Sequence, residues 1–87
     1  MNDDAIDPYD AELLQLISNL EGRIHPHVIK EAKELVEHGE YEVCLEAIIS
    51  NLESRGRPVP AEILNKIIEE SVGWGIKEDL YKVLRPE

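Results

Sequence analysis

The residues of this chain that are best suited to bind a soft metal ion are three histidines and one cysteine. They are His25, His27, His38 and Cys44. Zinc sites use histidine pairs in the i, i+4 relation on a helix, or cysteine pairs at short spacing. No pair among these four residues has either arrangement. We therefore expect no metal site and no cofactor, with His25 and His27 in a loop on either side of a proline and His38 at the end of a helix.

Cys44 is also the one candidate for a nucleophilic thiol. Its neighbours Val43 and Leu45 place it in an apolar helix, where burial raises the pKa of a thiol and makes it unreactive. The glycines of segment 73–75 do not form a phosphate loop, because the lysine and the preceding strand are missing. The sequence shows neither a nucleophile–base pair nor a metal set, so we expect a protein that is not an enzyme.

Glutamates offer a different chemistry, the attraction of a cationic protein. Glu42, Glu46 and Glu53, together with the hydroxyl residue Ser50, fall within an arc of about 80° on a helix, and Glu37 and Glu40 extend this acidic strip at its upper end. Glu42 and Glu46 stand at i, i+4, where like charges cost roughly 0.2–0.5 kcal/mol. A cationic partner would offset that repulsion. A solvated helix face explains the same residues, so both interpretations stay open.

Trp74 is the only tryptophan, and it lies between two glycines. The ring can fold back as a lid on the core. It can equally serve as an anchor for a partner, since tryptophan is enriched among the residues that dominate binding energy. The sequence leaves both roles open, and we include Trp74 with the acidic strip among the candidate binding residues.

The sequence pattern of residues 41–54 predicts a helix, and this helix carries most of the acidic strip. Outside the strip this segment is apolar over most of its circumference, at Tyr41, Val43, Cys44, Leu45, Ala47, Ile48, Ile49 and Leu52. A surface helix needs only one apolar stripe, so this helix should have neighbours on three sides. We expect it to be the central helix of the fold.

Prolines and glycines mark the other helices. Helices should begin at Pro8, Pro26 and Pro60, the first capped by Asp7, and glycines at 22 and 39 should end the first two. The fourth helix should bury one side that includes Val72, and a last helix should cover residues 76–84. The sequence thus predicts an all-α fold, a single-domain bundle of about five helices over residues 1–87, with residues 1–6 as a flexible tail.

One internal echo resembles a repeat. Arg23, Pro26, Ile29 and Gly39 recur 34 residues later as Arg57, Pro60, Ile63 and Gly73. This is the period of tetratricopeptide repeats, but the apolar positions between these landmarks do not keep phase. We interpret the echo as two helices that use similar residues to start and to end, and not as a repeat array.

Charge restricts the class of partner. The 87 residues contain 19 acidic and 9 basic side chains, for a net charge of −10. Such a chain repels nucleic acid and anionic membranes and attracts basic proteins. No apolar run is long enough to span a membrane, and the acidic N-terminus does not resemble a signal peptide. A single cysteine cannot form an internal disulfide, so we expect a protein of the reducing cytoplasm.

Residues 32–52, AKELVEHGEYEVCLEAIISNL, resemble the core of the MafI-type immunity proteins of bacterial polymorphic-toxin systems. The pattern is a helix ending at Glu37-x-Gly39-Glu40, a helix with Leu45-Glu46 and Leu52, then a short turn and a proline-started helix. The resemblance covers residues 23–72. The family is broadly similar to the immunity proteins of contact-dependent inhibition.

The resemblance implies an all-helical protein that binds and neutralises one cognate toxin domain, the C-terminal region of a secreted effector. Such toxins are often nucleases, including ribonucleases of the EndoU type, and a nuclease exposes a basic groove for phosphates. An alternative hypothesis is a helical adaptor or regulatory module without a toxin, whose binding groove should be apolar rather than acidic.

Overall fold

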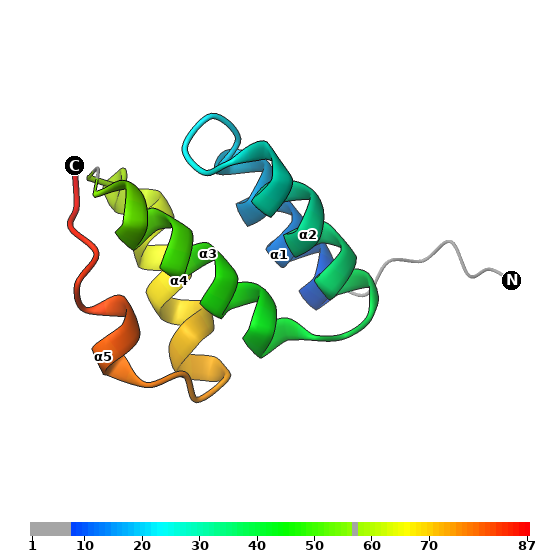
Figure 1. Ribbon diagram of the computed structural model, residues 1–87. Helices are drawn as coiled ribbons and strands as arrows, with labels where there is room; N and C mark the ends of the chain where they lie inside the picture. The colour runs from blue at the N-terminus through cyan, green and yellow to red at the C-terminus, as the bar shows by residue number, and fades with distance from the viewer. Residues whose placement is uncertain (1–7, 57) are drawn as a thin grey trace, which may run out of the picture.

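The computed structural model describes residues 8–56 and 58–87. Within these ranges the chain forms five helices and no β-strand, which confirms the all-α bundle (Figure 1). They are α1 (Pro8–Asn19), α2 (Pro26–Glu37), α3 (Tyr41–Arg55), α4 (Ala61–Gly73) and α5 (Glu78–Tyr81). The expected tail 1–6 and the capping residue Asp7 lie outside the described residues.

Helix α3 is the central helix, as the sequence predicted, and it extends one residue beyond the predicted end. It packs against α2, α4 and α5. Its five buried residues, Cys44, Leu45, Ile48, Ile49 and Leu52, are at most 4% exposed. Val43 departs from the prediction, because it is 46% exposed. Tyr41 and Ala47 of the apolar arc are partly buried, so Val43 near the N-terminal end is the one position of the arc that is exposed.

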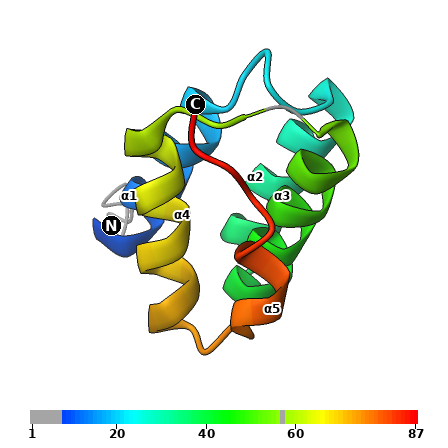
Figure 2. The same cartoon turned by 90° about the vertical axis from the view of Figure 1, so that its left-hand side faces the viewer.

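Helices α1 to α4 alternate in direction, so one end of the bundle holds the N-terminal ends of two helices and the C-terminal ends of the other two. The N-terminal ends of α1 and α3 lie there beside the C-terminal ends of α2 and α4 (Figures 1 and 2). This end carries the α2–α3 connection and the segment that follows α4. Two candidate binding residues, Glu40 and Trp74, belong to these segments, and Glu37, Glu42 and Glu46 lie on the adjoining turns of α2 and α3.

The α2–α3 connection is short because Glu40 takes part both in the C-terminal cap of α2 and in the start of α3. Gly39 has a φ of 73°, and its amide donates to the carbonyl of Val36 at 3.0 Å. The amide of Glu40 donates to the carbonyl of Leu35 at 2.8 Å, which completes a Schellman cap. The carbonyl of Glu40 then accepts the amide of Cys44 at 3.0 Å and begins α3. These bonds hold the corner between the two helices in one conformation.

Helix α4 ends with the same cap, two residues later than the internal echo suggests. The amide of Gly75 donates to Val72 at 3.1 Å and that of Ile76 donates to Ser71 at 2.9 Å. Gly75, with a φ of 73°, is the structural counterpart of Gly39, whereas Gly73 is the last residue of the helix. The two helices therefore end with the same type of cap, but the two caps do not lie at the 34-residue spacing.

The last helix is shorter than the predicted range 76–84. It spans four residues, because the chain beyond it leaves the helical path to pair with the α3–α4 connection (Figure 2). The amide of Val59 donates to Arg85 at 2.8 Å, and the amide of Glu87 donates to Val59 at 2.7 Å. Leu84 is buried while Leu80 and Val83 are exposed. Val72 of α4, which was expected on the buried side, is 61% exposed.

Ile48 tests the central position of α3, because its side chain is fully buried. Truncation to alanine should leave a cavity and cost roughly 2–5 kcal/mol, a large share of the stability of a domain of this size. Urea denaturation of Ile48→Ala and of the parent protein measures this loss. Replacement of the exposed Val43 by alanine is the control and should change the midpoint little. Equal midpoints for Ile48→Ala and the parent would contradict the central position of α3.

Candidate protein-binding surface

The five glutamates of the acidic strip are all exposed, but they do not form one continuous group. Glu37 ends α2, and Glu40 joins the two helices. Glu42 and Glu46 follow on the first two turns of α3. Glu53 lies 11 residues beyond Glu42, a rise of about 16 Å along the helix. The structure thus gathers four glutamates around the α2–α3 corner and leaves the fifth at the far end of α3.

Glu53 has a different electrostatic setting from the other four. It lines a shallow hollow with Pro58 and Leu84, and Arg85 contributes a positive charge to the same hollow. Arg55 ends the helix nearby. The basic side chains offset the carboxylate, so the end of α3 near Glu53 is less attractive to a cation than the corner is.

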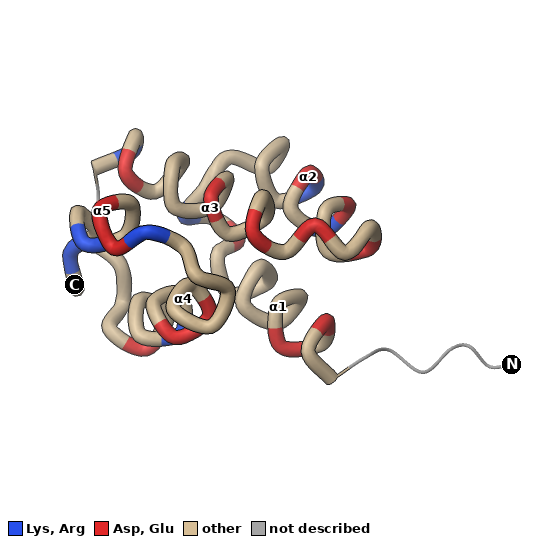
Figure 3. Tube along the Cα trace, turned by 90° about the horizontal axis from the view of Figure 1, so that it is seen from below, with Lys and Arg blue, Asp and Glu red and all other residues tan. Residues whose placement is uncertain are grey.

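The α2–α3 corner lies in a strongly acidic stretch of the sequence. Residues 31–46 contain six glutamates and one lysine. The lysine, Lys33, already lies 3.7 Å from the carboxylate of Glu21. Acidic positions recur along α2, where basic positions accompany them, and along the adjoining half of α3, while the chain around α5 also carries both signs of charge (Figure 3). A cationic partner would therefore be drawn towards the corner.

Trp74 and the acidic α2–α3 corner line the same hollow, which has a volume of about 300 Å³. The hollow is lined by Gly39, Glu40, Tyr41, Glu42, Val43 and Trp74. It contains two exposed carboxylates, two aromatic rings and the exposed side chain of Val43. The fold therefore brings Trp74 together with Glu40 and Glu42, although they are more than thirty positions apart in the sequence.

Three aromatic rings meet beside this hollow, one from α1, one from α3 and one from the end of α4. Tyr41 and Trp74 lie 5.0 Å apart between ring centroids and are tilted by 30°. Tyr9 meets each of them edge to face at 5.3 Å. Such pairs stabilise by about 0.5–1.5 kcal/mol beyond burial. Trp74 is half-buried, so the ring covers the core and still reaches the surface.

Hydrogen bonds hold the two tyrosines in place. The hydroxyl of Tyr41 donates to the carboxylate of Asp10 on α1. Burial raises the pKa of Tyr9, and a hydrogen bond to Glu70 raises it further, since both favour the neutral phenol. Both tyrosines therefore donate to carboxylates on a neighbouring helix, which fixes the rings that face Trp74.

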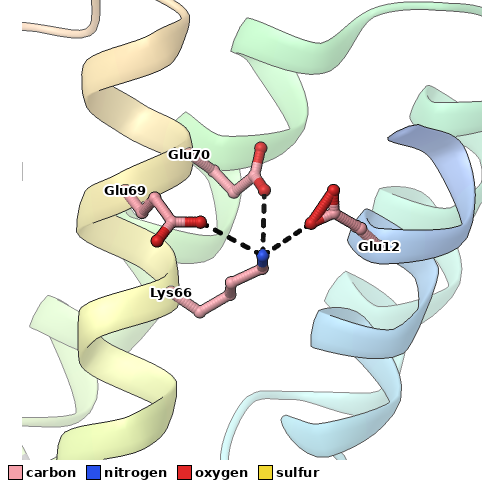
Figure 4. Close-up of polar contacts among 4 residues, drawn as sticks. All are labelled: Glu12, Lys66, Glu69 and Glu70. Carbon is pink, nitrogen blue, oxygen red and sulfur yellow. Dashed lines mark hydrogen bonds and ion pairs between the residues drawn. The ribbon is translucent and has the colours of Figure 1, made fainter. Parts of the chain in front are cut away.

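Lys66 connects α1 and α4 close to the aromatic rings. Its ammonium lies 2.7 Å from Glu12, 3.3 Å from Glu69 and 3.5 Å from Glu70 (Figure 4). Hydrogen bonds to Glu12 and Glu69 raise the pKa of Lys66. Glu70 is only 6% exposed, so this ammonium provides the charge that a buried carboxylate requires.

The histidines and the cysteine considered for metal binding or nucleophilic chemistry have structural roles in this fold. The ring of His25 accepts the amide of His27 at 3.0 Å and caps α2, so His27 belongs to the first turn of the helix rather than to a loop. His38 places a ring nitrogen 2.8 Å from the carbonyl of Glu34 at the end of that helix. Cys44 is fully buried, which raises the pKa of its thiol from 9.0 to about 12.

The sequence did not identify Tyr9 and Tyr41 as partners of Trp74. A signal was present, because the two tyrosines begin the first and third helices and Trp74 follows the fourth. In a bundle of alternating helices these positions meet at one end. The sequence also did not reveal that Glu40 and Glu42 share a hollow with Trp74, because that depends on how closely α4 approaches α3.

Comparison with protein-family models, with curated proteins and with solved structures finds no match to this chain. The resemblance to MafI-type immunity proteins therefore stays a prediction from residues 32–52. Among the described residues, no helix is long and apolar enough to cross a membrane. No group of three or more histidine, cysteine or acidic side chains in the same ranges is arranged to hold a metal ion.

Lys66 provides a test of the contacts that hold α1 against α4. Lys66→Met should lower the melting temperature, because three carboxylates would then repel one another and Glu70 would lose its counter-charge. Lys30→Met removes the same charge from an exposed position on α2 and is the control. Equal melting temperatures for the two variants would contradict this role of Lys66.

Proposed function

We propose that this protein is an immunity protein that binds and neutralises a cognate bacterial toxin domain in the cytoplasm. The observation that carries the proposal is the acidic α2–α3 corner, which lies within the segment that resembles the MafI-type family. The corner presents Glu37, Glu40, Glu42 and Glu46 to solvent. Its partner is a basic domain, of the kind found in nucleases, including ribonucleases of the EndoU type.

Electrostatics explains how such a protein would inhibit a nuclease. A nuclease binds phosphates through a basic surface, and a surface of opposite charge competes for it. With a net charge of −10, this chain would also associate rapidly with a basic domain at low salt. Inhibition of this kind requires no catalytic group and no metal ion in the inhibitor.

The adaptor hypothesis requires an apolar groove, and the surface supports it less. Val43, an exposed apolar side chain that lines the same hollow as Trp74, shares it with two carboxylates. A partner that docks here must satisfy those charges as well as cover the valine. We therefore favour a basic protein over an apolar helix as the partner.

The gene immediately upstream provides the toxin for a direct experiment. The proposal expects it to encode a large secreted protein with a variable C-terminal domain. Production of that domain in a sensitive strain should stop growth, and co-production of this protein should restore it. A toxin domain that kills equally in the presence and absence of this protein would contradict the proposed function.

Charge reversal on α3 tests the surface used for neutralisation. Glu42→Lys with Glu46→Lys should leave the fold intact, since both side chains are exposed, yet weaken toxin binding. Close interfacial charge pairs couple by about 1.5–7 kcal/mol. The dissociation constant and the association rate should be measured at several salt concentrations. The association rate should fall most at low salt, where the attraction is least screened.

Glu62→Lys with Glu78→Lys is the matched control, because it makes the same change in net charge on α4 and α5. This variant should retain most of the affinity. An unchanged dissociation constant for the α3 variant at low salt, or an equal loss in the control, would contradict the placement on the α2–α3 corner.

Neutralisation should also survive loss of the groups that could support catalysis or metal binding. His27→Ala and His38→Ala should each protect cells as well as the parent protein does, apart from any loss of stability. Cys44→Ser should do so wherever it remains folded. Growth assays combined with melting temperatures separate the two effects. A well-folded histidine variant that fails to protect would reveal a chemical role for that side chain.

A further inference from the structure

We infer that the hollow between Trp74 and the α2–α3 corner binds one arginine side chain of a basic partner protein. This inference deepens the proposed function, and it rests on that function for the identity of the protein that supplies the arginine. It specifies the kind of side chain that the partner must present and the residues that receive it. The receiving residues are Glu40, Tyr41, Glu42, Val43 and Trp74.

The lining of the hollow matches the two parts of an arginine side chain. The lining includes two residues with carboxylates, Glu40 and Glu42, and two aromatic residues, Tyr41 and Trp74, whose ring centroids are 5.0 Å apart. The volume of about 300 Å³ is ample for one long side chain. Val43, at 46% exposed, offers an apolar contact for the methylene groups. A purely acidic or purely apolar side chain would leave half of this lining unmatched.

Arginine fits this lining better than lysine does. Its guanidinium group is planar, stacks on aromatic rings and donates two parallel hydrogen bonds to a carboxylate. An ammonium group is compact and strongly hydrated, and it cannot stack in the same way. The tilted pair of rings and the adjacent carboxylates therefore present the two kinds of contact that a guanidinium group combines.

Trp74 is held beside the hollow by contacts of its ring. Among the described residues its buried indole nitrogen has no hydrogen-bond partner, so ring contacts rather than polar bonds hold the side chain. Glycines at 73 and 75 flank it. The Schellman cap fixes the backbone beneath the ring, and the contacts with Tyr9 and Tyr41 hold the ring beside the hollow, where a guanidinium group can stack on it.

A peptide titration observed by NMR tests the inference without any toxin. The probe is a capped tripeptide with arginine between two alanines, and its partner probe replaces arginine with the neutral isostere citrulline. Trp74 is the only tryptophan, so a single indole resonance reports on the hollow. The arginine peptide should shift this resonance and the amides of residues 39–43 in a saturable manner. The citrulline peptide should bind about fivefold more weakly, as a lost cation–π contact implies.

Two variants separate this hollow from the general negative field. Glu40→Gln with Glu42→Gln should weaken the arginine peptide by about threefold, the scale of exposed charge pairs. Glu31→Gln with Glu34→Gln removes the same charge from exposed positions on α2 that do not line the hollow, and should change the affinity little.

Three results would overturn the inference: an indole resonance that does not move, equal binding of the citrulline peptide, or an equal loss in the α2 variant. None of them would decide whether the protein neutralises a toxin, which the growth experiment measures separately. Conversely, a protein that fails to protect cells could still bind the arginine peptide. The two proposals can therefore fail independently.

Discussion

The enclosure of α3 is the constraint on which the rest of the structure depends. Three helices cover its apolar residues, and Leu45, Ile48 and Ile49 are almost completely removed from water. Burial of side chains of this size contributes roughly 1.5–3 kcal/mol each. Once these positions face inward, the helical period leaves Glu42 and Glu46 facing solvent. The acidic surface is therefore a direct consequence of how the core is packed.

The helix caps convert this packing into a defined surface. Glu40 closes the cap of α2 and begins α3, so the carboxylates around it are held on a short, rigid corner. The equivalent cap of α4 carries Trp74 to the same end of the bundle. Tyr9 and Tyr41, bonded to carboxylates on other helices, complete the contact between them. Like charges remain crowded there because the core and the caps, rather than the charges, determine the backbone.

Local chemistry explains what could be predicted from the sequence. Prolines, glycines and the apolar period located four helices and the central role of α3, because these signals act over one or two turns. The last helix was predicted too long, since its apolar spacing does not reveal that residues beyond Leu84 pair with Val59. Val72 and Val43 were placed inside for the same reason: the period identifies a face, but not where the neighbouring helix ends. The acidic residues were found, whereas their assembly with Trp74 depends on the tertiary contact of α4 with α3.

Hydrogen–deuterium exchange of the proposed complex, formed with the toxin domain that the proposal expects to be encoded upstream, tests the central claim most directly. The claim is that the partner covers the acidic corner and Trp74. Binding should slow exchange of backbone amides in residues 37–46 and 73–77, and leave the opposite end, residues 52–56 and 83–87, unchanged. Slower exchange confined to that opposite end, around Glu53 and Arg85, would contradict the account.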